Sequence, residues 1–395
     1  MMAKSNDSDV KNTMQMHSQA KVEFYKTYLE KYLAILRATQ YVKHINIYDV
    51  FCGKGIYDDG GKGSPVVAYD TIKAVCEKQR LEHTTEISLI VNDIDKERIG
   101  KVKEYIKKNE HSYCNVEYYN LDIDEMFKTI LPKLDNSSDD TRNLIFIDPY
   151  GYKTIKRELI CELMKNGKTE IILFLPISHM QRFTNAAVQD KQAVAQYEPL
   201  REFVFGFFPD PNHPIRQNPV SAKDYIKFVA DALTFNNIFL TTSYYIERDK
   251  SNCFALFFMS PHIFGLEKIV EAKWELDEEA GKGFRIPERT GNLFEREFAE
   301  EAKISNGLRL KSLLEKELCR PTTSRKLHEI VVKNGFLPKH ANEVLKQIQQ
   351  ENPKLIVKDF KTGEPLRKGA FFISHKPSKI VIIYLENEDH KDRMD

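Results

Sequence analysis

Two short segments that end apolar strands constrain the fold of this 395-residue chain more than any other feature. In the first, Ile47–Tyr57, an apolar stretch reaches Asp49 and continues into a turn with two glycines. In the second, Leu144–Gly151, another apolar stretch delivers Asp148. In an open parallel sheet the ligand lies outside the carboxyl ends of the strands. The two segments therefore predict a nucleoside-containing cofactor beside an acceptor group.

Strand and helix patterns alternate along the first half of the chain. We predict a helical stretch at 21–41, strands at 45–51, 87–91, 116–120, 144–147 and 170–175, and helices at 65–78, 96–108, 124–134 and 155–166. This rhythm is typical of βαβ units that build a parallel sheet. Two further strands, at 239–246 and 253–259, are joined by a short polar link and predict an antiparallel hairpin. Class I methyltransferases end a parallel sheet with such a hairpin, so we expect their α/β, Rossmann-like fold.

The pattern changes along the chain and predicts four parts. Residues 1–17 are polar and expected to form a disordered tail, and residues 387–395 a charged tail. A methyltransferase-like domain is expected over 18–290, with an aromatic- and proline-rich insertion at 181–220 that covers the active face or binds substrate. Over 300–386, three helix patterns lead into strands at 355–360, 370–373 and 381–385, which is the layout of a winged helix.

Positive charge gathers in the C-terminal part. Residues 303–385 contain 17 Lys and Arg against 7 Asp and Glu, although the whole chain has a net charge of only +1. A basic module on an acidic body is typical of a polyanion-binding appendage, and a solvated Lys-rich surface or a protein-contact module is the alternative. The residues expected at the phosphates of DNA or RNA are Lys339, His340, Lys346, Arg367 and Lys368.

Cysteine usage and hydropathy indicate the compartment. The six cysteines are scattered without a Cys-x-x-Cys spacing, which favours reduced thiols over disulfides or a zinc site, and we expect no bound metal. No apolar run approaches the roughly 18 residues of a membrane span. The N-terminus lacks the apolar core of a signal peptide. These patterns predict a cytoplasmic protein that does not associate with a membrane.

The glycine turn and the strand ends that follow predict a site for S-adenosylmethionine. Gly53 and Gly55 let the backbone pass close to a ligand, and Asp49 can accept a hydrogen bond from the ammonium group of the cofactor. Asp93 ends the second strand, where an acid can bind both ribose hydroxyls. The predicted site is completed by Phe51 of the turn, by Asp122 at the adenine amino group and by Ile123 beside the adenine ring. For Asp122, capping of the next helix is the alternative.

Asp148, Pro149 and Tyr150 are the catalytic candidates. The exocyclic amine of a base is a poor nucleophile because its lone pair is delocalised into the ring. A carboxylate and a backbone carbonyl that accept the two amine hydrogens would localise that lone pair toward the methyl carbon, and the site would mainly position the reactants. Tyr150 or Tyr152 could stack on the base. The alternative is that Asp148 caps the helix after the strand.

Four separated segments resemble the bacterial and phage family of three-Cys-motif partner proteins. They are Asp49–Tyr57 with Gly63–Pro65, Phe146–Gly151, Phe257–Gly265 and Asn334–Leu345, and the resemblance covers about Lys21 to Leu385. It implies a methyltransferase-like fold and gene association with a protein that carries a three-cysteine motif, of radical-SAM character. The first segment also resembles the Asp-x-x-x-Gly-x-Gly-x-Tyr motif of ribosomal-RNA adenine methyltransferases. Those enzymes carry Asp-Pro-Pro-aromatic at the catalytic strand, where this chain has Tyr150 as the third residue.

Two functions are therefore expected from the sequence. The first is a methyltransferase that uses S-adenosylmethionine and acts on the exocyclic amine of a base in DNA or RNA. The second is a partner protein that keeps the fold, with or without the cofactor, and works together with a three-Cys-motif protein in a phage or phage-defence setting.

Overall fold

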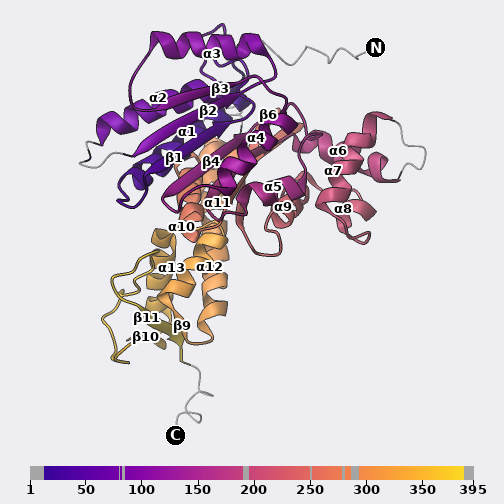
Figure 1. The fold of residues 1–395 in the computed structure, drawn as a ribbon. Helices are drawn as coiled ribbons and strands as arrows, with labels where there is room; N and C mark the ends of the chain where they lie inside the picture. Colours follow the sequence, from indigo (N-terminus) through magenta and orange to yellow (C-terminus); the bar gives the residue numbers. More distant parts are fainter. Residues whose placement is uncertain are drawn as a thin grey trace. The chain divides into compact units, whose positions relative to one another are not determined.

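The structure is a computed structural model that describes residues 13–79, 81, 85–189, 195–249, 251–277, 281–285 and 293–386. The chain forms two compact units (Figure 1). The first comprises Met1–Pro261 and Gly283–Ile286, and the second comprises His262–Lys282 and Pro287–Asp395. The predicted charged tail at 387–395 and residues 1–12 of the predicted N-terminal tail lie outside the described residues.

An eight-stranded mixed sheet forms the centre of the first unit, in the order β3-β2-β1-β4-β5-β7-β6-β8. Its strands are β1 (His44–Asp49), β2 (Glu86–Asn92), β3 (Asn115–Tyr119), β4 (Thr141–Ile147), β5 (Thr169–Leu175), β6 (Leu240–Asp249), β7 (Asn252–Ser260) and β8 (Gly283–Phe284). The first five strands are parallel. Strand β7 is antiparallel to both β5 and β6, so the predicted parallel sheet with a terminal antiparallel hairpin is confirmed.

Helices cover both faces of this sheet (Figure 1). Helix α1 (Met16–Arg37) packs on α2 (Ser64–Lys78), which packs on α3 (Lys96–Lys108). Tyr25 of α1 stacks on Phe146 of β4 with ring centroids 4.4 Å apart. The neighbouring Ile145 and Ile147 belong to the core formed with α4 (Ile123–Asp135), α5 (Arg157–Met164) and α9 (Ala222–Ala232). Successive side chains of a strand point to opposite faces, and β4 is buried on both.

The predicted insertion at 181–220 consists mainly of helices. They are α6 (Ile177–Gln189), a 3₁₀ turn η2 (Ala195–Tyr197), α7 (Glu198–Phe207) and the one-turn helix α8 (Pro214–Gln217). Phe203, Val204 and Phe207 share one side of α7 and are buried, which is the spacing of an amphipathic helix. Figure 1 shows this group of helices beside α5 and α9.

The last residues of the predicted disordered tail are ordered. Met14 is buried, and its backbone N–H donates to Oδ2 of Asp59 at 2.9 Å. Helix α1 begins at Met16, before the predicted start of the helical stretch at residue 21. Sequence composition did not predict this because the partner of Met14 lies 45 residues further along the chain.

The second unit combines four helices with an antiparallel three-stranded sheet of order β10-β11-β9 among the described residues. Its elements are α10 (Ile263–Leu276), α11 (Leu293–Leu318), β9 (Thr322–Thr323), α12 (Ser324–Lys333), α13 (Pro338–Glu351), β10 (Leu355–Asp359) and β11 (Val381–Leu385). The three predicted helices correspond to α11, α12 and α13, and two of the three predicted strands correspond to β10 and β11. Leu314, Leu327 and Phe336 lie in the core of this unit.

In the second unit one prediction fails, and one helix was not predicted. Residues 370–373 form no strand: Phe371 and Ile373 are buried as an alternating pattern requires, but Phe372 has a φ of +52°, which a strand does not accept. Helix α10 was not predicted. Its buried side includes the charged residues Glu267 and Lys273, which obscure the apolar period of the helix.

Candidate active site

The order of the strands reverses between β1 and β4, and this switch point positions the candidate site. Strand β1 pairs with β2 on one side and with β4 on the other. The segments that follow the two central strands therefore diverge, and open sheets of this kind bind ligands outside the carboxyl ends at such a point. Asp49 ends β1 and lies opposite Phe146 of β4, and Phe146 is two residues before Asp148. The two acids that the sequence singled out thus lie at the same edge of the sheet.

The glycines of the turn after β1 have different roles. Gly53 and Gly55 both adopt left-handed backbone conformations, with φ of +62° and +69°. A Cβ atom on Gly55 would lie 2.5 Å from Cγ2 of Val102 on α3, whereas a Cβ on Gly53 would meet nothing within 4 Å. Gly55 therefore allows the turn to pack against α3, and Gly53 leaves open space beside the backbone where a ligand can approach.

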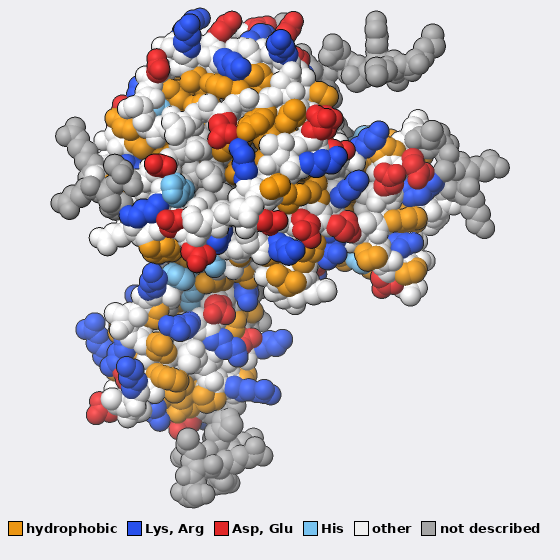
Figure 2. Space-filling view, in the orientation of Figure 1, with side chains coloured by type: hydrophobic (Ala, Val, Ile, Leu, Met, Phe, Trp, Pro, Cys, Tyr) orange, Lys and Arg blue, Asp and Glu red, His pale blue; other side chains and the backbone are white. Residues whose placement is uncertain are grey.

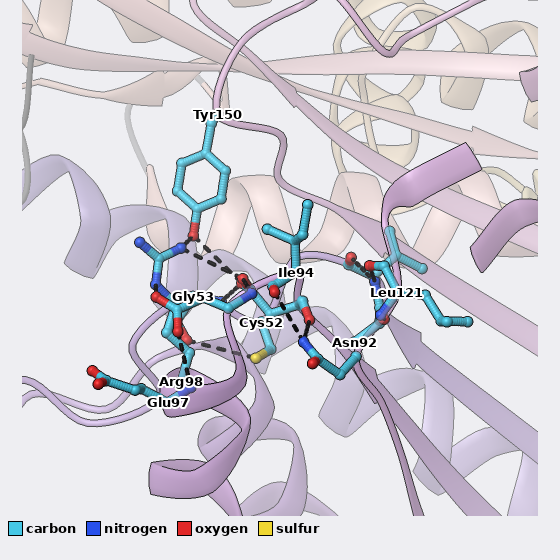
Figure 3. A network of polar contacts seen from close by, with 12 residues as sticks. Cys52, Gly53, Asn92, Ile94, Glu97, Arg98, Leu121 and Tyr150 are labelled. Carbon is cyan, nitrogen blue, oxygen red and sulfur yellow. Dashed lines mark hydrogen bonds and ion pairs between the residues drawn. The ribbon is translucent and has the colours of Figure 1, made fainter. Parts of the chain in front are cut away.

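Asp93 and Asn92 tie the strand ends together behind this turn (Figure 3). The buried Asp93 carboxylate accepts the backbone N–H groups of Gly53 and Asp95, each at 3.0 Å. Asn92 donates to the carbonyl of Leu121 at 3.1 Å and accepts its N–H at 3.0 Å. The ends of β1, β2 and β3 are therefore fixed relative to one another. Sequence reasoning missed Asn92, although a polar residue at the end of an apolar strand was a visible signal.

Tyr150 reaches from the end of β4 across to the end of β2. Its side chain is 65% exposed, and its hydroxyl lies 3.4 Å from Oδ2 of Asp93 and accepts a hydrogen bond from Arg98. The Arg98 guanidinium also pairs with Asp93 at 3.6 Å and with Asp95 at 3.3 Å. The ring of Phe51 lies edge-on to Tyr150, with centroids 6.4 Å apart. Figure 3 shows Tyr150 and Arg98 pointing toward one another beside Gly53.

Asp49 is the most unusual polar group at this edge. It is completely buried, and neither carboxylate oxygen makes a hydrogen bond of good geometry with a described residue. Burial raises its pKa to about 7, and the nearby negative charge of Asp148 adds to the rise. The Ser64 hydroxyl, the Lys21 ammonium and the Phe51 N–H lie close enough to lower the pKa without cancelling that rise. A buried carboxylate without good partners is costly, so the site is suited to a cationic ligand group.

Asp148 is paired with a lysine that sequence reasoning missed. The ammonium of Lys21, from α1, forms a hydrogen-bonded ion pair with Oδ2 of Asp148. Lys21 also lies over the ring of Phe174 at 4.6 Å from its centroid. The side chains of Lys21 and Asp148 are 12% and 21% exposed, and Pro149 beside them is buried. Asp148 thus lies just after β4 with one carboxylate oxygen occupied by a cation.

The predicted adenine-binding residues Asp122 and Ile123 are less clearly placed for that role. The exposed Asp122 caps α4, because its Oδ1 accepts the Glu125 N–H at 2.9 Å. Ile123, the first residue of α4, is buried in the hydrophobic core of the first unit. Asn120 donates to the carbonyls of Asp93 and Ile94 at 2.8 and 2.9 Å and so holds the loop after β3 against the end of β2.

A row of aromatic rings begins next to the β4 loop and runs into the helical insertion. Tyr152 contacts His179 of α6 (5.8 Å between centroids), His179 contacts Phe183 (4.9 Å), and Phe183 stacks on Tyr197 (5.8 Å). Burial lowers the pKa of His179, which keeps the ring neutral at pH 7. The rings of Tyr152, Phe183 and Tyr197 also pack against the hydrophobic core of the first unit.

In the second unit, four of the five predicted phosphate-binding residues are exposed: Lys339, Lys346, Arg367 and Lys368. The N–H of Gly369 donates to Gln349 of α13 at 3.0 Å, and Cε of Lys346 lies 4.0 Å from the position of a Cβ on Gly369. The loop after β10 thus lies along α13 and brings Lys346 close to the loop that carries Arg367 and Lys368. Figure 2 shows Lys and Arg side chains spread over this unit.

His340, the fifth residue, has a different role. Its Nδ1 accepts the N–H of Leu337 at 3.2 Å at the start of α13, and its ring packs on Trp274 with centroids 4.3 Å apart. Burial lowers the pKa of His340 to about 4, so the ring is neutral at pH 7. A neutral capping group is a poor phosphate ligand, so this arrangement does not favour the phosphate contact expected for His340, which stays a prediction.

Other chemistry is sparse in the part of the chain that the structure describes. No group of three or more His, Cys, Asp or Glu side chains there could hold a metal ion. The cysteines are free thiols, and burial raises the pKa of Cys52 in the glycine turn, so this thiol stays protonated. No helix among the described residues is long and apolar enough to cross a membrane.

Comparisons with known proteins find likeness only at the level of solved structures. No protein-family model matches the chain, and no curated protein sequence matches it significantly. The resemblance to three-Cys-motif partner proteins therefore has no counterpart in these comparisons.

Three solved structures to which this chain is similar are methyltransferases, each at low sequence identity. WbdD, a bifunctional kinase-methyltransferase, matches 61% of this chain at 11% identity with a TM-score of 0.33, and this chain spans 39% of WbdD. An O-methyltransferase from Bacillus cereus, in complex with SAH, matches 60% of this chain and 80% of its own at 12% identity, with a TM-score of 0.30. TomG from Streptomyces achromogenes, in complex with SAM, matches 62% and 87% at 14% identity, with a TM-score of 0.31. The α/β fold of this chain rests on its own strand order and pairing.

Proposed function

We propose that this protein is a methyltransferase that uses S-adenosylmethionine and acts on the exocyclic amine of a base in DNA or RNA. The observation that carries the proposal is the buried Asp49 carboxylate, whose oxygens lack good partners, next to the open Gly53 turn. The amino-acid end of S-adenosylmethionine supplies an ammonium group that would pair with such a carboxylate. The residues present thus fit the cofactor.

The remaining cofactor contacts follow from the strand ends. Asp93 would accept hydrogen bonds from the ribose hydroxyls once Tyr150 gives up its own bond to that carboxylate. Asp122, which caps α4, keeps one carboxylate oxygen available for the adenine amino group. When bound, S-adenosylmethionine supplies a methyl group: the new C–N bond to the acceptor forms as the S–CH₃ bond breaks, the thioether leaves and the amine loses a proton to solvent.

The acceptor would lie at Asp148, Pro149 and Tyr150. Asp148 would accept one hydrogen of the amine and orient its lone pair, and the exposed Tyr150 ring would stack on the base. The aromatic row from Tyr152 to Tyr197 supports a planar acceptor because aromatic side chains stack on the faces of bases.

The second unit would bring the nucleic acid to the enzyme as a winged helix. Its helices α11, α12 and α13 precede the strands β10 and β11, and the N–H of Gly369 in the loop after β10 donates to Gln349 of α13. Lys339, Lys346, Arg367 and Lys368 are exposed and would meet phosphates. A cytoplasmic location belongs to the same proposal and agrees with the free thiols.

One observation favours the second candidate, a non-catalytic partner of a three-Cys-motif protein in a phage or phage-defence setting. Tyr150 stands where ribosomal-RNA adenine methyltransferases carry a second proline, and its hydroxyl is engaged by Arg98 and Asp93. A Tyr150 side chain held from the end of β4 to the end of β2 in this way would suit a protein that binds its ligand without turnover.

Isothermal titration calorimetry with S-adenosylmethionine tests the cofactor site. We expect binding by the wild-type chain and a loss of affinity of about tenfold or more in Asp93→Ala, because the ribose would lose its acceptor. Asp124→Ala, an exposed acid on α4, serves as the control. Absence of heat in the wild type, or equal affinity in Asp93→Ala, would refute the cofactor proposal.

A further inference from the structure

Lys21 lies near the start of α1 and reaches Asp148, which follows β4. The residues around it anchor the start of α1: Met14 donates its N–H to Asp59, and His17 stacks on Phe254 with centroids 5.1 Å apart. A Cβ on Gly61 would lie 2.7 Å from Cβ of Met14, so the loop after the glycine turn packs closely against this end. The Lys21 backbone is therefore fixed, and only its side chain is able to change partner.

The ammonium of Lys21 serves two acids. It pairs directly with Asp148 and also acts electrostatically on Asp49, whose carboxylate feels the negative charge of Asp148 as well. The Lys21 ammonium lies over the Phe174 ring, 4.6 Å from the ring centroid. A lysine has a long flexible stem with a single charge at its tip, which lets the charge move several ångströms while the backbone stays in place.

The amino-acid end of the cofactor would bring an ammonium and a carboxylate group close to Asp49 and Asp148. Its ammonium matches Asp49, and its carboxylate then needs a cation close to the same point because a carboxylate beside Asp148 would be repelled. Among the described residues, Lys21 pairs with Asp148 and acts electrostatically on Asp49, so it can supply this cation.

We propose that Lys21 exchanges partners: it neutralises Asp148 in the cofactor-free protein and turns to the cofactor carboxylate when the cofactor is bound, which frees Asp148 for the acceptor amine. This inference rests on the proposed function and deepens it. Lys21 is a positioning residue, since it acts on the acceptor through Asp148. The acceptor site is then complete only after the cofactor is in place, so the two substrates bind in that order.

The test compares two ligands that differ only in the carboxylate: S-adenosylhomocysteine and its decarboxylated analogue, titrated by calorimetry into the full chain. For Lys21→Met we expect affinity for S-adenosylhomocysteine to fall about 10- to 100-fold, and affinity for the analogue to stay within about twofold. Lys21→Arg keeps the cation and should restore most of the difference. Lys26→Met, a more exposed lysine on the same helix, should bind both ligands as the wild type does.

A second arm separates exchange from a static role. Asp148→Asn removes the resident partner of Lys21, so the affinity for S-adenosylhomocysteine should rise roughly threefold. The same substitution in a Lys21→Met background should give no rise. A thermal melt of each variant shows that it is folded.

The outcomes distinguish this inference from the proposed function. If the wild type binds neither ligand, the cofactor site and the exchange both fail. Suppose the wild type binds S-adenosylhomocysteine. If Lys21→Met then weakens the affinity for both ligands equally, or for neither of them, the exchange is overturned and the cofactor site stands. If Asp148→Asn strengthens binding to the same extent with and without Lys21, the exchange is also overturned.

Discussion

The hydroxyl of Tyr150, which follows β4, lies 3.4 Å from Oδ2 of Asp93, which follows β2. The two strands are separated in the sheet by β1, so this contact crosses the end of the strand that carries the glycine turn. Arg98 reinforces it from α3 by bonding to the Tyr150 hydroxyl. An exposed side chain thus occupies an acceptor that a ribose would need.

Removal of the Tyr150 hydroxyl should strengthen cofactor binding. In Tyr150→Phe the ribose no longer competes with the tyrosine hydroxyl for Asp93. A hydrogen bond of this kind contributes about 0.5–1.5 kcal/mol. The affinity for the cofactor should therefore rise about two- to tenfold. Calorimetry with S-adenosylhomocysteine measures the change. Tyr41→Phe, another exposed tyrosine that contacts an arginine, is the control. Unchanged or weaker binding in Tyr150→Phe would contradict the competition.

The two glycines of the turn should respond differently to alanine. Gly55→Ala meets Val102 and has an unfavourable φ, so it should lower the free energy of unfolding by about 2–4 kcal/mol. Gly53→Ala has only the unfavourable φ, which costs about 1–2 kcal/mol, and it should weaken cofactor binding because the Cβ fills the open space. Urea unfolding gives both free energies. Gly167→Ala, at a φ of +68° with no neighbour, isolates the backbone cost. Similar losses in all three variants would argue against the close contact with Val102.

Stability should depend on pH through Asp49. Burial raises its pKa from 3.8 to about 7, so the folded protein keeps a proton that the unfolded chain loses near pH 4. The resulting stabilisation is fully present below about pH 4 and is lost as the pH rises to about 7. Relative to Asp49→Asn, the free energy of unfolding of the wild type should fall by about 2 kcal/mol between pH 5 and 7 and then level off. Parallel pH profiles of the two proteins would show that Asp49 does not titrate in this range.

Cofactor affinity should follow the opposite trend. The cofactor ammonium pairs with ionised Asp49, so binding of S-adenosylhomocysteine should tighten as the pH rises through about 7 and then become constant. Asp49→Asn should bind more weakly at pH 8 and lose this dependence. Calorimetry at pH 6, 7 and 8 provides the comparison, and a wild-type affinity that does not change with pH would contradict the pairing.

Nucleic-acid binding by the second unit should depend on Lys346, Arg367 and Lys368 but not on the charge of His340. Replacement of each of the three by Gln in the full chain should reduce the slope of log affinity against log salt by about 0.9 on duplex DNA. His340→Gln should leave the slope unchanged, because the ring is neutral at pH 7. Fluorescence anisotropy with labelled DNA or RNA measures the slopes, and Lys316→Gln, an exposed lysine on α11, is the control. Binding that does not depend on salt would refute the phosphate contacts.

The strand ends could be predicted from sequence because their signals are local. Apolar runs that end in Asp49, Asp93 and Asp148 specify buried parallel strands with polar carboxyl ends. The topology of parallel βαβ units then brings the carboxyl ends of these strands to one edge of the sheet, whichever side chains they carry. The hairpin of β6 and β7 was equally visible because its two strands are adjacent in the chain.

The partners of those acids could not be predicted, because they come from distant parts of the chain. Lys21 lies 127 residues from Asp148, and Arg98 lies 52 residues from Tyr150. His340 resembled a solvated basic residue, and only the packing of α10 brings Trp274 against it. In each case a tertiary contact, rather than a local pattern, decides what the side chain does.

Transfer of a labelled methyl group distinguishes a methyltransferase from a protein that only binds the cofactor. The full chain is incubated with S-adenosylmethionine labelled in its methyl group and with total cellular DNA or RNA, and the nucleosides are separated after digestion. We predict label on the exocyclic nitrogen of one base, lost in Asp148→Ala while calorimetry still detects cofactor binding by that variant. Cofactor binding without label in any nucleoside would contradict the account and favour the non-catalytic partner.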